Sequence, residues 1–266
     1  MTPIDPDDDS FYYRRTGAGV YQPTIHVQGA WNDHEQHMAP ISGLITHELA
    51  RHDHRDDMQI GRLSFEILGL IPLQESTIEV QTIRPGRTIE LLEATLIIGG
   101  RAIIRARAWR LSVQDMRSFA AVELPTMADP ADCAPIDGTR EWPGGYIASL
   151  DITAAPGGRS GRRSVWIRSN CRLIDDGSAD PLASYVMLID TANGIATRVR
   201  PTELMFPNVD LTVHLLRQPD PALVGLATEV SFGPDGLGLT SSTLNDVHGP
   251  VGRAEQCLTV RPFPTR

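Results

Sequence analysis

The sequence contains two copies of one pattern: an apolar, helix-like stretch, then strand-like stretches, then a turn that contains glycine. In the first copy, 37 residues separate Leu63, where a strand-like run begins, from Gly100 of the turn. In the second copy, 38 residues separate Leu211 from Gly249. Repetition at a fixed spacing constrains the fold more than any single motif does. The differences between the two copies are where we look for chemistry.

Each copy opens with a predicted helix, over residues 39–50 in the first and 183–192 in the second. Asp180-Pro181 precedes the second helix as a predicted N-cap and first helical residue. The segment 76–111 is rich in β-forming residues and predicts strands. One helix followed by antiparallel strands is an α+β arrangement, and two such units joined edge to edge protect the edges of both sheets.

Length, charge and composition restrict the class of protein. The chain has 266 residues, enough for one large or two modest domains, and its net charge of −9 argues against nucleic acid as a partner. All 24 basic residues are arginine, which excludes chemistry by a lysine side chain. Three widely spaced cysteines form no disulfide framework and no metal-ligand motif. There is no apolar run long enough to span a membrane and no signal-like N-terminus, so a cytoplasmic location is expected.

The composition predicts three segments: an N-terminal unit over 1–120, a linker over 121–163 and a C-terminal unit over 164–266. Within the first unit, residues 1–28 are predicted to be a loose leader that ends in a strand-like stretch from Tyr21 to Val27. The linker is rich in Pro, Gly and Asp and is expected to wrap the surface. The segment Gly157–Ser164, where the linker joins the C-terminal unit, contains three arginines, which suit either a clamp for phosphate groups or a solvated linker.

A set of short motifs follows in a fixed order across the two halves of the chain. None is strongly specific alone, and their order and spacing carry the argument. They are Ser64-Phe65 with Leu70 and Pro72, Arg84–Thr88, Gly99-Gly100, Trp166–Arg168, Ile189-Asp190, Asp210–Arg217 with Pro219, and Gln256.

With these motifs the chain resembles the acyl-CoA thioesterase II family over about residues 20–262. The resemblance implies a double hotdog fold, with two tandem units that each wrap an antiparallel sheet around a central helix. It implies hydrolysis of an acyl-CoA substrate, no cofactor or metal, and a homo-oligomer, a dimer of double hotdogs. Carried over by position, the catalytic residues are Asp190, Ser231 and Gln256, with Thr228 as the alternative hydroxyl. The family's Gly-Gly turn before the first helix reads His37–Pro40 here.

Thioester hydrolysis requires a positioned water, a base for its proton and a donor for the developing oxyanion. Asp190 follows four apolar residues, so its carboxylate is expected to be partly buried and to need a partner. Gln256 alternates with apolar neighbours on a predicted strand. From this pattern alone, Gln256 would simply belong to the polar face of the strand. Ser231 alone is most simply a structural hydroxyl. The acyl chain is expected to lie beside Leu188, Ile189 and Ile195.

Five histidines lie between residues 34 and 54 and invite a metal-site interpretation. His47 and His52 are separated by five positions, about 140° around a helix, so both cannot face one ion. With several aspartates nearby, a solvated surface is the favoured interpretation of this segment. The five are His34, His37, His47, His52 and His54.

Two other functions stay open. A hotdog hydratase or dehydratase uses an Asp and a His five residues later, but Ile195 follows Asp190 at that distance, and Asp33 and His37 are four apart. A protein that binds acyl-CoA or lipid without turnover is the other alternative. Alignment of the two copies places Thr46 opposite Asp190 and Arg107 opposite Gln256, which predicts one active site per chain, in the second unit.

Overall fold

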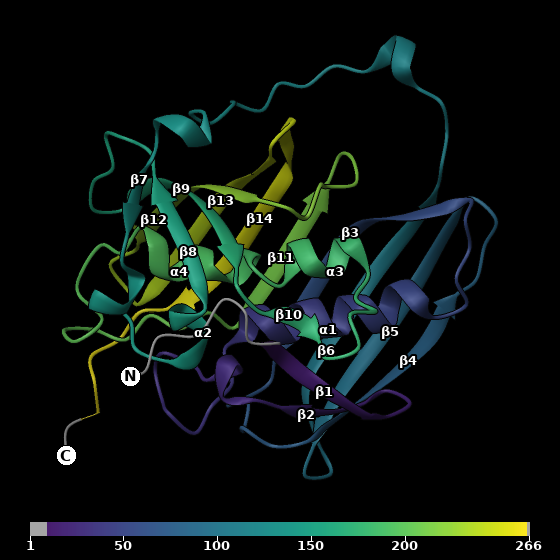
Figure 1. The fold of residues 1–266 in the computed structure, drawn as a ribbon, viewed down its shortest axis with the longest axis horizontal. Coiled ribbons are helices and arrows are strands. Elements are labelled where there is room, and N and C mark those ends of the chain that lie inside the picture. The colour runs from purple at the N-terminus through teal and green to yellow at the C-terminus, as the bar shows by residue number, and fades with distance from the viewer. Residues whose placement is uncertain (1–9, 265–266) are drawn as a thin grey trace.

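The computed structural model describes residues 10–264, so the predicted N-terminal features at residues 1–9 lie outside the described part (Figure 1). The strands are β1 (Phe11–Gly17), β2 (Val20–Pro23), β3 (Met58–Ile67), β4 (Ser76–Arg84), β5 (Ile89–Ile98), β6 (Arg101–Ser112), β7 (Ala134–Ile136), β8 (Leu150–Ala154), β9 (Arg162–Ser169), β10 (Arg172–Ile174), β11 (Asp210–Leu215), β12 (Val224–Phe232), β13 (Leu237–Asp246) and β14 (Gly249–Thr259). The helices are α1 (Met38–Arg51), α2 (Gly145–Ala148), α3 (Pro181–Val186) and α4 (Ala192–Ile195), with 3₁₀ turns η1 (Ile25–Val27), η2 (Arg117–Phe119), η3 (Pro130–Asp132), η4 (Gly138–Arg140) and η5 (Ile189–Thr191).

The fourteen strands found between residues 10 and 264 form one sheet, in the order β10-β1-β2-β4-β5-β6-β3-β11-β14-β13-β12-β9-β8-β7. The run β3-β6-β5-β4 in the first half has the same order as β11-β14-β13-β12 in the second. The halves meet where β3 and β11 pair antiparallel, with Leu63 opposite Val213 and Phe65 opposite Leu211. The pairing of β3 with β11 is therefore nearly two-fold symmetric.

The predicted turns are present. Gly99 and Gly100 both have positive φ (57° and 75°), the conformation that a two-residue hairpin requires, and they connect β5 to β6. Gly249 has a φ of 108° at the turn between β13 and β14. The prediction of a loose leader is wrong for residues 11–20, because β1 and β2 pair with each other and β1 also pairs with β10. The strand-like stretch predicted from Tyr21 agrees with β2 as far as Pro23, whereas residues 25–27 form η1.

Helix α1 is buried along most of its length, which its apolar sequence favours over a one-sided amphipathic helix. His37 caps its start, since Nδ1 of His37 accepts the backbone N–H of Ala39 at 3.1 Å. Arg110 lies at its other end and donates to the carbonyl oxygens of Leu49 at 2.9 Å and of His52. Both ends of the helix therefore have partners for backbone groups that the helix leaves unpaired.

Helix α1 packs directly against the helical segment of the second half (Figure 1). A Cβ at Gly43 would lie 2.5 Å from Cβ of Met187 and 2.8 Å from the carbonyl oxygen of Ala183. Gly43 therefore permits the close approach of the two halves, and no larger residue fits there without movement.

The second predicted helix is not continuous. Asp180 caps α3 as expected, with Oδ1 accepting the N–H of Leu182 at 2.8 Å. The α-helix then ends, and η5 and α4 follow as separate short turns. The break frees the carbonyl oxygen of Met187, and the hydroxyl of Tyr146 donates to it at 3.3 Å. A tertiary contact thus compensates for the interrupted helix.

The predicted linker contains two kinds of structure. Residues 113–129 run over the surface and are largely exposed, as the long teal trace in Figure 1 shows. From residue 134 to 154 the chain adds β7 and β8 to the sheet and buries Tyr146 in α2. The boundaries at residues 120 and 163 stay a prediction. Within residues 10–264, no helix has the length and apolar character needed to cross a bilayer.

Candidate active site

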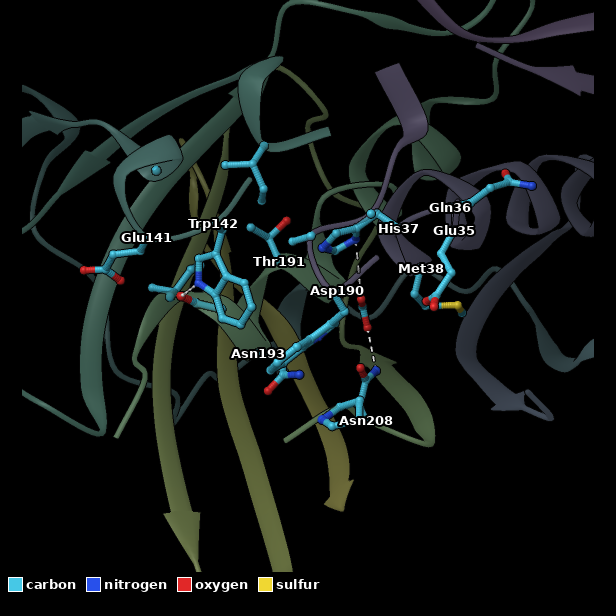
Figure 2. A pocket seen from close by; sticks show the side chains of 18 of the residues that line it. Glu35, Gln36, His37, Met38, Glu141, Trp142, Asp190, Thr191, Asn193 and Asn208 are labelled. Atoms are coloured by element: carbon cyan, nitrogen blue, oxygen red, sulfur yellow. Dashed lines mark hydrogen bonds and ion pairs between the residues drawn. The ribbon is translucent and has the colours of Figure 1, made fainter. Parts of the chain in front are cut away.

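A cavity of about 860 Å³ opens between the two halves of the chain (Figure 2). Its walls come from the segment before α1, from the stretch between β7 and α2, and from the η5–α4 turn with the segment just before β11. The polar lining residues include Gln36, His37, Glu141, Asp190, Asn193 and Asn208.

Asp190, in η5, lines this cavity and is only 4 % exposed. Its Oδ1 accepts two hydrogen bonds, from Nδ2 of Asn208 and from Nε2 of Gln256, both at 2.7 Å. No hydrogen bond to Oδ2 is present among residues 10–264, and the nearest positively chargeable atom is Nδ1 of His37 at 3.8 Å. One carboxylate oxygen is therefore held, and the other is available to a molecule in the cavity.

Burial raises the pKa of Asp190 to about 6. The hydrogen bonds from Asn208 and Gln256 act in the opposite direction, because they stabilise the charged form, and the charge of Asp210 adds a smaller upward effect. The carboxylate is thus ionised at neutral pH but more basic than an exposed one. A base of this strength is suited to accept a proton near neutral pH.

Gln256 reaches Asp190 from the inward face of the sheet. It lies on β14, opposite Thr240 on β13, which in turn lies opposite Val230 on β12. All three are buried, as expected for paired residues on one face. The prediction that Asp190 and Gln256 belong to one constellation agrees with this geometry.

Ser231 is not brought to Asp190. It follows Val230 by one position, so its side chain points to the opposite, exposed face of the sheet, where it pairs with Leu239. Thr228 faces inward but lies two residues before Val230 on β12, and its hydroxyl pairs with that of Ser242 at 2.9 Å. Neither hydroxyl has a hydrogen bond to Asp190.

Asn208 is the group that the sequence interpretation missed. It lies just before β11, and its Nδ2 bridges Oδ1 of Asp190 and the carbonyl oxygen of Asp210 at 3.0 Å. Asn208 is two residues from Asp210 of the motif quoted above, and this proximity was the available sequence signal. An amide at this position fixes the carboxylate as a hydroxyl would, by donating one hydrogen bond.

His37 brings the first half of the chain into the site. Its side chain is 16 % exposed and lines the cavity, and its ring lies 4.3 Å from that of Tyr146. The prediction of a solvated surface for this segment is wrong for His37 and for His47, which is fully buried between Arg15 and the backbone of Asp180. The described residues contain no group of three side chains placed to hold a metal ion.

The register of the strands revises the comparison between the two copies. Leu63 pairs with Ala108, and the β11–β14 register, continued by one residue, places Leu211 opposite Gln256. The counterpart of Gln256 is therefore Ala108, and the alignment with Arg107 is wrong by one position. Thr46 donates to a backbone carbonyl within α1. The first half has neither a carboxylate nor an amide in the corresponding places.

The rest of the cavity wall is largely aromatic and apolar. Trp31 and Trp142 pack edge to face with centroids 4.9 Å apart, and Nε1 of Trp142 donates to the carbonyl oxygen of Gly194 at 3.0 Å. Ile195 lines the cavity as predicted, whereas Leu188 and Ile189 are buried elsewhere in the core. Arg163, from the arginine-containing segment, also lines the cavity.

Two family models match the chain. Residues 27–111 match the N-terminal domain of acyl-CoA thioesterase, and residues 130–260 match its C-terminal domain. No curated protein matches the sequence significantly. Together the two matched ranges cover most of the chain.

Solved structures share the fold at low sequence identity. One is a conserved protein with hot dog fold from Alicyclobacillus acidocaldarius, with TM-score 0.73 and 16 % identity over 97 % of this chain and 98 % of that one. Another is a thioesterase II from Thermobifida fusca, with TM-score 0.69 and 16 % identity over 98 % of both chains. A third is the acyl-CoA thioesterase II TesB2 from Mycobacterium marinum, with TM-score 0.66 and 15 % identity over 96 % of both. The chain thus has a hotdog fold, belongs to the acyl-CoA thioesterase family and is a thioester hydrolase.

Proposed function

We propose that this protein hydrolyses an acyl-CoA thioester by a water molecule that Asp190 activates. The observation that carries the proposal is the asymmetry of the Asp190 carboxylate, with Oδ1 held by two amides and Oδ2 free in the cavity. In this proposal each half is one hotdog unit, and the two form a tandem double hotdog.

In the proposed reaction, the oxygen of water attacks the thioester carbonyl carbon while Oδ2 of Asp190 accepts one proton. The tetrahedral intermediate collapses, the carbon–sulfur bond breaks, and the proton on Asp190 passes to the departing thiolate. The products are a free acid and CoA. Asn208 and Gln256 keep Oδ1 fixed throughout, so Oδ2 has a defined direction.

The cavity suits a substrate with an apolar acyl end and a charged carrier. Trp31, Trp142 and Ile195 offer an apolar wall, and Arg163 offers a positive charge at the lining for a phosphate group. An acyl-CoA combines these two features. The homo-oligomeric state and the cytoplasmic location stay predictions.

The test is release of free thiol from a panel of acyl-CoAs of different chain length, measured alongside hydration of an enoyl-CoA with the same enzyme. Thiol release that depends on enzyme concentration, with no hydration, is the expected result. Hydration without thiol release would replace this proposal with the hydratase alternative. Tight binding without either reaction would favour an acyl-CoA binding protein.

A further inference from the structure

We propose that His37, from the N-terminal half, is a further catalytic residue of this site, and that its Nε2–H donates a hydrogen bond to the thioester carbonyl oxygen as negative charge develops there. The inference rests on the proposed hydrolysis. It makes the active site a product of both halves, instead of the second half alone.

The hydrogen bond that caps α1 fixes the tautomer of His37. A backbone N–H is a donor only, so Nδ1, which accepts the N–H of Ala39 at 3.1 Å, carries no proton. The ring proton therefore lies on Nε2, for which no partner is present in the described part of the chain. Burial lowers the pKa of His37 to about 3, so the ring stays neutral at physiological pH. A neutral imidazole with a fixed Nε2–H is a donor, and it is not a base.

The same tautomer decides between two chemistries for the His37–Asp190 pair. Dehydration of a hydroxyacyl thioester by this pair would need an unprotonated histidine nitrogen facing the substrate. Nδ1 is occupied by Ala39, and Nε2 carries the proton. Nδ1 and Oδ2 of Asp190, 3.8 Å apart, are both acceptors, so their approach is not an ion pair. Hydrolysis, which needs a donor beside a base, fits the arrangement better.

The start of α1 has few other donors to offer. Among the first three helical residues, the backbone N–H of Ala39 already donates to His37, and Pro40 has no N–H. Met38 is therefore the one of the three whose N–H remains available. The imidazole supplies the donor that this sequence removes from the helix start. Its ring is held by Tyr146, whose hydroxyl is bonded to that of Thr191 at 2.6 Å.

Oδ2 of Asp190 and the ring of His37 border the same cavity, and Figure 2 shows the two side chains facing each other. A carbonyl carbon attacked by water at Oδ2 would then place its oxygen within reach of the imidazole. Donors aimed at the developing oxyanion are usually the largest single contribution to acyl-transfer catalysis.

Two substitutions test the proposed Nε2–H donor of His37 separately from its role as the N-cap of α1. Asn and Ser are strong N-cap residues, so His37→Asn and His37→Ser keep an acceptor for the N–H of Ala39 while neither reaches the position of Nε2. His34→Asn is the matched control, since the side chain of His34 is 88 % exposed. Thermal unfolding of each variant is the check that it is folded.

For both His37 variants we expect kcat to fall about 10²–10³-fold while KM changes less than about threefold. The His34→Asn control should retain wild-type kcat. If the wild-type enzyme releases thiol and both variants keep kcat within about threefold, the role of His37 is overturned and the proposed function stands. If the wild type releases no thiol, both are overturned.

A measurement on the wild-type protein covers the case in which the variants do not fold. In ¹⁵N-histidine NMR, His37 should show a protonated Nε2 and an unprotonated Nδ1. Its Nε2 signal should move when a ketone analogue of acyl-CoA binds, and less when a thioether analogue without the carbonyl binds. The opposite tautomer, or equal shifts with both analogues, would overturn the inference.

Discussion

Nε2 of Gln256 donates to Oδ1 of Asp190 at 2.7 Å, which joins the last strand of the sheet to a helical turn 66 residues earlier in the chain. The contact fixes the orientation of a buried carboxylate and lowers the pKa that burial raises. Position and basicity of the proposed base are therefore set by the same side chain.

This contact predicts a pH dependence. In the wild type, kcat/KM should rise with pH around an apparent pKa of about 6, because Asp190 acts in its ionised form. Gln256→Leu removes a hydrogen bond that stabilises the charged form, so the profile should move to higher pH and kcat should fall. Glu255→Gln, on the outward face beside it, is the control. An unchanged apparent pKa in Gln256→Leu would argue against this role of the amide.

Either Asn208 or Ser231 is the third group that acts with Asp190 and Gln256, and substitutions of these two residues should have opposite effects. Asn208→Ala should lower kcat at least about tenfold, since it removes the second donor to Oδ1 of Asp190. Ser231→Ala should stay within about twofold of the wild type, because its side chain lies on the outer face. Thiol-release kinetics of the two variants decide the matter, and the reverse order of effects would restore the assignment made from sequence.

The buried charge of Asp190 also predicts a cost in stability. The folded-state pKa of about 6 exceeds the ordinary value of 3.8, so the folded protein binds this proton more tightly than the unfolded chain does. The free energy of unfolding therefore falls as pH rises from about 4 to 6, by about 3 kcal/mol in total. Asp190→Asn carries no charge and should gain stability relative to the wild type across this range.

Urea unfolding of both proteins at about pH 4 and pH 8 measures this difference. Loss of hydrogen-bond geometry in the variant would shift both values equally, so the change between the two pH values is the diagnostic quantity. A stability difference that is the same at both pH values would show that Asp190 titrates normally in the folded protein.

Local patterns in the sequence predicted much of the architecture. The pair Gly99-Gly100 and the single Gly249 marked hairpins because glycine adopts positive φ without strain, and the repeated spacing anticipated the repeated strand order. Asp190 stood out as a carboxylate in an apolar helix, and its partner Gln256 was inferred from family resemblance.

The misses have a common physical origin. Strand residues alternate between faces, so the strand register decides that Ser231 lies on the exposed face and that Ala108, instead of Arg107, is the counterpart of Gln256. Asn208 and His37 reach the site through contacts between distant segments, and the local sequence offered a signal only for Asn208, in its closeness to Asp210. The break after α3 likewise lies where the chain packs against α1 and where the hydroxyl of Tyr146 donates to the carbonyl oxygen of Met187.

The most direct test of the account is thiol release by Asp190→Asn, measured at about pH 8 on the best acyl-CoA of the panel. Asp33→Asn is the matched control, since the side chain of Asp33 is 74 % exposed. The account predicts that kcat/KM falls at least about 10²-fold in Asp190→Asn and is unchanged in the control. Retention of more than about one third of wild-type kcat/KM by folded Asp190→Asn would contradict it.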